Sequence, residues 1–214
     1  MIHPPLIKFV GLDLDLTLYK ENKKVEEAFR NAWYTLMASE FEISYQEAKK
    51  KFLEYRKTIT GGCAIARAMG IKDPENFAMR ASTKAKTHLY LKKDQRLVDL
   101  IKYLQEKYVL FLVTASAKAD AYLKLKKLGI DPKNDFQYKI FGDSEKSGKF
   151  NGKSFSKLIK MTKGKPREHL FVGDKEAQDI IPAKRAGMQT VMVWKQSKNA
   201  DLSLPTIYDL EKWL

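Results

Sequence analysis

The stretch that decides the fold is Val10-Gly11-Leu12-Asp13-Leu14-Asp15-Leu16-Thr17-Leu18-Tyr19, in which an apolar run ends in two carboxylates. The run begins at Leu6 and predicts a buried strand over residues 6–12. Because alternate residues of a strand point the same way, Asp13 and Asp15 are expected to emerge together at its carboxyl end. Two neighbouring anions repel each other unless a cation or a proton lies between them. The pattern therefore favours a metal-assisted site over the simpler alternative, a solvated loop after a strand.

Four further segments predict buried strands, at residues 108–113, 136–141, 169–172 and 190–194. Most of them are nearly continuous apolar runs, which is typical of parallel strands that are covered on both faces. Helical patterns occur at residues 94–107, 119–128, 154–161 and 176–186. Pro182 is expected to kink the last of these helices. The alternation of strand and helix predicts an α/β fold with a parallel sheet.

Residues 20–91 interrupt this alternation and are predicted to be entirely helical. Ser44 and Glu47 have the spacing of a capping box, and Asp73-Pro74 fits a helix cap followed by proline in the first turn. We therefore expect a helical domain, residues 20–91, inserted into an α/β core formed by residues 1–19 and 92–214. An insertion at this point can lie over the carboxyl ends of the strands, where such folds bind ligands.

The composition limits the class of protein. The chain has 214 residues, of which 44% are hydrophobic, and this is enough for one sizeable core with a smaller appended unit. No apolar run reaches the roughly 18 residues of a membrane span, and the first residues lack the pattern of a signal peptide. The single cysteine, Cys63, excludes an internal disulfide and is expected to be a small buried hydrophobe. These features predict a cytoplasmic protein without a membrane partner.

The net charge of +14, from 40 basic and 26 acidic residues, predicts attraction to polyanions or to phosphorylated metabolites. The basic residues are spread along the chain, and Lys124, Lys126 and Lys127 are expected to form a solvated face of a helix. No zinc-finger spacing or RNA-binding motif occurs, so a nucleic-acid partner would rest on charge alone. A basic polyanion-binding protein with a retired catalytic site stays an alternative.

Three other signals lie at the ends of predicted strands or in the turns beside them. Thr114 follows the second strand, where its hydroxyl and the backbone N–H groups after it can hold an anion. A turn before the helix at residue 154 contains Lys149 and Lys153. Asp174 ends the fourth strand and Asp179 follows one helical turn later, which gives an oxygen donor set suited to Mg²⁺. The simpler alternatives are helix caps and solvated lysines.

In this order, the signals resemble the motifs of the haloacid dehalogenase (HAD) superfamily of phosphohydrolases along the whole chain. The resemblance is carried by Asp13-Leu14-Asp15-Leu16-Thr17, Thr114, Lys149 or Lys153, and Gly173-Asp174-Lys175-Glu176-Ala177-Gln178-Asp179. It implies a Rossmann-like parallel sheet with an inserted all-helical cap of the C1 type. The opening motif and residues 55–69 are also similar to pyrimidine 5′-nucleotidases of this superfamily. The Lys-Pro dipeptide of the family is absent, so the sequence leaves the two lysines as alternatives.

The resemblance also implies a role for each acidic residue. Asp13 would be the nucleophile that forms an aspartyl-phosphate, and Asp15 would protonate the leaving alcohol and then activate water. Mg²⁺ would be bound by the Asp13 side chain, the Asp15 backbone carbonyl and Asp174. Asp179 would support the metal site from behind its direct ligands.

The expected function is that of a Mg²⁺-dependent phosphatase for small phosphate monoesters, such as a nucleotide or a sugar phosphate. Thr114 and the Ala115 N–H would hold the phosphate, and Lys149 or Lys153 would neutralise it. A phosphotransferase or phosphomutase shares the first half-reaction and stays an alternative. A receiver domain does not fit, because it would carry neither the helical insertion nor the second aspartate. The expected substrate-selecting residues are in the insertion: Tyr55, Arg56, Arg67 and Arg80.

Overall fold

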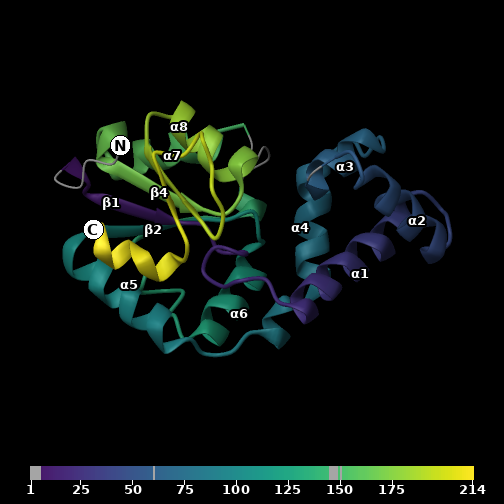
Figure 1. Cartoon of the computed structure of the whole chain (residues 1–214), viewed down its shortest axis with the longest axis horizontal. Coiled ribbons are helices and arrows are strands. Elements are labelled where there is room, and N and C mark those ends of the chain that lie inside the picture. Colours follow the sequence, from purple (N-terminus) through teal and green to yellow (C-terminus); the bar gives the residue numbers. More distant parts are fainter. Residues whose placement is uncertain (1–5, 60, 145–148, 150) are drawn as a thin grey trace. The chain divides into compact units, whose positions relative to one another are not determined.

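A computed structural model describes residues 6–59, 61–144, 149 and 151–214, and the chain forms two compact units (Figure 1). The first unit holds the chain up to residue 20 and again from residue 91, and the second unit holds residues 21–90. Each unit encloses a hydrophobic core of its own. Within the described residues, no helix combines the length and the apolar character that crossing a bilayer requires.

The first unit is built on a parallel sheet of six strands in the order β3-β2-β1-β4-β5-β6. The strands are β1 (Phe9–Leu12), β2 (Val109–Val113), β3 (Tyr138–Ile140), β4 (His169–Gly173), β5 (Gln189–Val193) and β6 (Leu202–Leu204). The first five are the predicted strands, and the α/β fold with a parallel sheet is confirmed. The sequence did not predict β6, because a strand of three residues is too short to show a periodic pattern.

Helices connect consecutive strands from β1 to β5 and cover both faces of this sheet, whereas a loop at residues 194–201 joins β5 to β6 (Figure 1). One face carries α5 (Gln95–Lys107), α6 (Lys118–Leu128) and the C-terminal 3₁₀ helix Ile207–Lys212, and the other carries α7 (Lys153–Thr162) and α8 (Ile181–Arg185). Right-handed crossovers require this division, because the chain moves outward from β1 in one direction and outward from β4 in the other. The direction reverses between β1 and β4, which is where open α/β sheets bind ligands.

The helix after β4 differs from its prediction. Pro182 does not kink a continuous helix, because Glu176–Ile180 forms a π-helical turn and α8 begins only at Ile181. Pro182 therefore lies in the first turn of α8, where its missing N–H has no helical partner to lose. Turns of the π type occur often at functional sites, and this one holds Asp179.

The described residues of the second unit form helices joined by turns, with no strand among them. Its helices are α1 (Lys23–Glu40), α2 (Tyr45–Tyr55), α3 (Gly62–Ala68), α4 (Pro74–Ala85) and the 3₁₀ helix Thr87–Tyr90. The capping box of Ser44 and Glu47 is confirmed, as is the Asp73 cap with proline in the first turn of α4. Aromatic rings of three helices meet in its core, and Cys63 is buried as predicted.

Gly11 determines how the centre of the sheet packs. It pairs in register with Phe111 of β2 and with Phe171 of β4. A Cβ atom on Gly11 would lie 1.9 Å from Cε2 of Phe111. That ring has little room to retreat, because it stacks on Phe171, which in turn meets the edge of Phe155 at 4.8 Å between ring centroids. The Phe111 ring thus occupies the space that a side chain at position 11 would need.

We expect Gly11→Ala to destabilise the protein by about 1–3 kcal/mol or more, because the added methyl overpacks a filled core. Thermal unfolding should show a lower Tm, by about 2–4 °C per kcal/mol for a chain of this size. The double variant Gly11→Ala/Phe111→Leu should recover part of the loss, because it removes the clashing ring atoms. An unchanged Tm in the single variant would contradict this account of the packing.

Candidate active site

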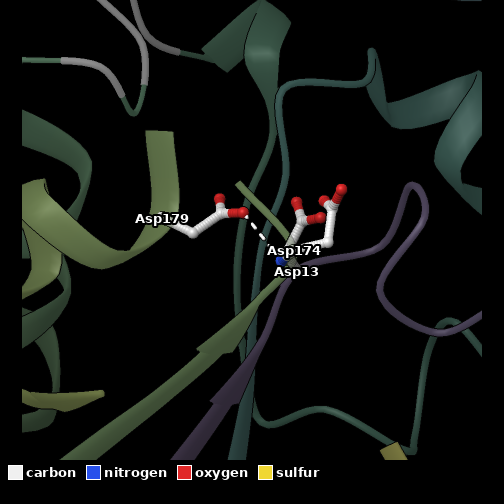
Figure 2. A group of neighbouring side chains, drawn as sticks. All are labelled: Asp13, Asp174 and Asp179. Carbon is white, nitrogen blue, oxygen red and sulfur yellow. Dashed lines mark hydrogen bonds between the residues drawn. The ribbon is translucent and has the colours of Figure 1, made fainter. Parts of the chain in front are cut away.

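Three aspartates from separate places in the chain converge at the carboxyl ends of β1 and β4 (Figure 2). Asp13 follows β1 directly, Asp174 follows β4 directly, and Asp179 comes from the π-helical turn. Their exposed fractions are 5%, 2% and 1%, and one oxygen atom from each lies within 4.8 Å of the others. Because β1 and β4 are neighbours in the sheet, the topology brings these carboxylates together although 161 positions separate Asp13 from Asp174.

Lys149 balances part of this buried negative charge. Its Nζ lies 2.6 Å from Oδ1 of Asp13 and 2.5 Å from Oδ1 of Asp179. Burial alone would lower the pKa of Lys149, but the two carboxylates raise the pKa above its ordinary value, so the ammonium stays charged. Burial raises the pKa of both Asp13 and Asp174. The buried ammonium of Lys149 contacts Asp13 and Asp179, while Asp174 is paired with two partly exposed lysines, Lys175 at 3.9 Å and Lys195 at 3.7 Å. Partly exposed ammonium groups at such distances compensate buried charge only weakly, which leaves the cluster suited to a further cation.

Hydrogen bonds fix the orientation of the same carboxylates. Thr17 Oγ1 donates to Oδ2 of Asp13 at 2.9 Å and approaches Oδ1 of Asp174 at 3.5 Å. The backbone N–H of Asp174 donates to Oδ2 of Asp179 at 3.1 Å, the dashed line in Figure 2. Gly173 permits this approach, since a Cβ there would lie 2.3 Å from Cβ of Asp179. Oriented carboxylate oxygens of this kind fit a hard divalent cation such as Mg²⁺.

The two lysines that the sequence left as alternatives lie in different environments. Lys149 is buried and in contact with the carboxylates. Lys153 begins α7 with an exposed side chain, and its backbone N–H donates to Oδ1 of Asn151. The structure therefore brings Lys149, and not Lys153, into the acidic cluster.

Thr114 and Ala115 follow β2, the other neighbour of β1, and so lie at the same edge of the sheet as the aspartates. The Thr114 side chain is buried, and its Oγ1 accepts a hydrogen bond from the backbone N–H of Ser116 at 3.1 Å. Ala115 is exposed in the turn between them. A turn held in this way can present backbone N–H groups to an anion.

Asp15 lies in a second cluster, distinct from that of Asp13. Its Oδ1 accepts hydrogen bonds from Tyr19 Oη at 2.6 Å and from Lys124 Nζ at 2.7 Å. Its Oδ2 accepts one from Ser116 Oγ at 2.5 Å. Burial would raise the pKa of Asp15, but the contact with Lys124 and the hydrogen bonds outweigh it and lower the pKa to about 2. The turn after Asp15 contains Leu16 in the left-handed region, at φ 66°.

The prediction that Lys124 belongs to a solvated helix face is wrong. Its side chain is 0% exposed, and its Nζ lies 2.7 Å from Asp15 Oδ1 and 2.7 Å from Asp120 Oδ2. Lys126 and Lys127 of the same helix are exposed, as predicted.

The reason for the burial of Lys124 is its position on α6. It lies three residues after Ala121 and four residues before Leu128, both of which are buried on the face that covers the sheet. Asp120, four residues earlier, is the helical neighbour that can pair with it. An acid–lysine pair beside an apolar helix face is the signal that could have identified this residue.

The four residues expected to select the substrate lie in the second unit. Arg67 forms an ion pair with Glu75 at 2.8 Å, and Arg80 lies 3.7 Å from Glu40. Of the other two residues, Tyr55 is half-buried and Arg56 is exposed.

Comparisons with known proteins find relatives along nearly the whole chain. The family model described as haloacid dehalogenase-like hydrolase matches residues 10–193. A glyceraldehyde 3-phosphate phosphatase of Methanopyrus kandleri is 30% identical over 208 residues, which cover 92% of this chain and 88% of the relative. A protein of the same name from Pyrococcus furiosus is 28% identical, with 92% and 85% covered. The crystal structure of a HAD phosphatase from Thermococcus onnurineus matches with a TM-score of 0.65, 25% identity and 97% of each chain covered.

We expect Lys149→Met to lower the free energy of unfolding by about 3–5 kcal/mol in metal-free buffer, because it leaves buried carboxylates without their ammonium. Added Mg²⁺ should restore part of the loss, since a ligand that binds only the native state stabilises it. Thermal unfolding with and without Mg²⁺ measures both effects. The matched control, Lys153→Met, removes an exposed lysine and should leave Tm unchanged. Equal Tm values for the two variants would show that Lys149 does not balance the cluster.

Proposed function

The chain belongs to the haloacid dehalogenase-like hydrolases and is a phosphohydrolase, and from this premise we propose that it hydrolyses a small sugar phosphate through an aspartyl-phosphate on Asp13. The observation that carries the proposal is the buried cluster of Asp13, Asp174 and Asp179 around Lys149. This cluster supports the proposal, because the carboxylate that would attack phosphorus lies beside the carboxylates that would bind the cation, at the edge where such sheets bind ligands.

Two steps at phosphorus complete the reaction. In the first, a carboxylate oxygen of Asp13 forms a bond to phosphorus while the bond to the leaving alcohol oxygen breaks. The ionised Asp15 would take a proton from the monoanionic phosphate group of the substrate and pass it to that oxygen. In the second, Asp15 takes a proton from water as the water oxygen attacks phosphorus, which releases inorganic phosphate and restores the carboxylate of Asp13. Asp15 then gives that proton to the released phosphate and ends the cycle ionised, as it began.

The side chains of Asp13 and Asp174 and the backbone carbonyl of Asp15 would hold Mg²⁺, with Asp179 fixing the loop that carries Asp174. When bound, the ion offsets the repulsion between the attacking carboxylate and the phosphoryl oxygens. The donor set is composed of oxygen atoms alone, as Mg²⁺ prefers.

Side chains and backbone groups at the carboxyl ends of the same strands would hold the phosphoryl group of the substrate. Thr114 and the Ala115 N–H would donate hydrogen bonds to its oxygens, and the Lys149 ammonium would neutralise charge that develops on them. Lys149 suits this role because the carboxylates around it keep it charged.

The relatives support the substrate class, because they are named glyceraldehyde 3-phosphate phosphatases and match this chain over 88% and 85% of their length. We infer that a triose phosphate or a similar small sugar phosphate is the substrate, with residues 21–90 as the C1-type cap that selects it. The net charge of +14 favours the approach of an anionic metabolite. The similarity to pyrimidine nucleotidases stays a prediction that the same assay tests.

We expect Asp13→Asn to lower Mg²⁺-dependent hydrolysis of p-nitrophenyl phosphate by about 10³-fold or more, because removing a nucleophile removes the covalent route. Chelation of Mg²⁺ should abolish the activity of the unchanged protein, and added Mg²⁺ should restore it. Circular dichroism should show that the variant is folded at the assay temperature, which separates lost chemistry from lost folding. Full activity in Asp13→Asn would reject the nucleophile assignment.

A panel of phosphorylated metabolites with Mg²⁺ tests the substrate class. We expect kcat/KM for glyceraldehyde 3-phosphate to exceed that for pyrimidine 5′-mononucleotides by at least about 10-fold, a difference that a few pocket contacts can supply. Released phosphate and the kinetics of each substrate are the measurements. Preference for the nucleotides would replace the sugar phosphate proposal with a nucleotidase.

A further inference from the structure

A buried ammonium lies behind Asp15, where the proposed chemistry does not use it directly. Lys124 comes from α6, is 0% exposed, and bridges two carboxylates, with its Nζ 2.7 Å from Asp15 and 2.7 Å from Asp120. The same Nζ donates to Ser116 Oγ at 3.0 Å, and that hydroxyl donates to the other oxygen of Asp15. Both oxygens of the Asp15 carboxylate are therefore linked, directly or through Ser116, to one lysine.

Stability alone is a poor reason for this arrangement. Moving an ammonium out of water costs several kcal/mol, and replacing a buried ion pair by well-packed apolar residues is often neutral or stabilising. Lys124 shares the buried face of α6 with Ala121 and Leu128, where an apolar side chain would be the simpler choice. The geometry is better explained by what Lys124 does to the carboxylate that it contacts.

Asp15 needs such support, because it lies in an irregular turn and not in a strand or helix. The turn passes through Leu16 in the left-handed region, and the Asp15 side chain is 15% exposed, so one side of it faces solvent. Lys124 instead extends from a helix and is fixed from its own helix by Asp120, four residues earlier. A side chain of the regular helix α6 thus holds the side chain of Asp15, which lies in an irregular turn.

We propose that Lys124, held by Asp120, is a positioning residue that fixes the Asp15 carboxylate in the orientation required for proton transfer to the leaving oxygen. The proposal rests on the proposed role of Asp15. A displacement of about 1 Å in a reacting group can cost on the order of 10²-fold in rate. Neither Lys124 nor Asp120 contacts the substrate phosphate in this scheme.

The test compares two substrates that differ in their need for a proton. The alkoxide released from glycerol 3-phosphate is a poor leaving group and requires protonation, whereas nitrophenolate from p-nitrophenyl phosphate leaves readily without it. We expect Lys124→Met to lower kcat/KM for glycerol 3-phosphate by about 10²-fold, and for p-nitrophenyl phosphate by only a few fold. Lys124→Arg should recover part of the selective loss, because a guanidinium can also bridge two carboxylates.

Two further variants keep the test decisive. Asp120→Asn retains the contact between Lys124 and Asp15, and should show the same selectivity with a loss of about 5-fold, since only the tether is weakened. If Lys124→Met does not fold, Asp120→Asn still tests whether Lys124 positions Asp15. Lys127→Met replaces an exposed lysine of the same helix and is the matched control. It should leave kcat/KM unchanged for both substrates.

Asp15→Asn supplies the reference for the outcome. If it shows the selective loss and neither Lys124→Met nor Asp120→Asn does, the positioning role is overturned while the proposed function stands. An equal loss for both substrates, with a lower Tm, would mean that Lys124 is merely structural and would also overturn it. If Asp15→Asn itself shows no selectivity, the proton-transfer role of Asp15 fails and the inference falls with it.

Discussion

Mutual repulsion among three buried carboxylates is the constraint on which the site depends. Asp13, Asp174 and Asp179 lie close together with little solvent to screen them, so their burial is tolerable only with compensating charge. Lys149 supplies one ammonium between Asp13 and Asp179. The partly exposed Lys175 and Lys195 offset the charge of Asp174 only weakly, at 3.9 and 3.7 Å. The remaining negative charge makes the cluster suited to a divalent cation, and through it to a phosphate group.

The two aspartates of the opening motif are neighbours in sequence, but their environments push their pKa values in opposite directions. Burial raises the pKa of Asp13, whereas Lys124 and the hydrogen bonds of Ser116 and Tyr19 lower the pKa of Asp15. Asp15 therefore stays ionised, whereas Asp13 needs the charge of a further cation to stay ionised. Each aspartate also has its own lysine, from a different part of the chain, so the two clusters can be altered independently.

Much of the fold could be predicted because local pattern and tertiary environment agree. The buried strands of a parallel sheet read as continuous apolar runs, and the caps at Ser44 and Asp73 are local hydrogen bonds within a few residues. The exceptions are short or irregular. β6 has too few residues to show a period, and the π-helical turn before α8 replaces the kink expected at Pro182.

The sequence by itself determined the α/β alternation, the helical insertion and the acidic residues at strand ends, because these depend on periodicity and on residues near one another in the chain. It could not decide between Lys149 and Lys153, nor show that Lys124 is buried. Those outcomes depend on which strands become neighbours and on which helix face meets the sheet. Only the tertiary structure, with β1 between β2 and β4, decided which charges share a buried space.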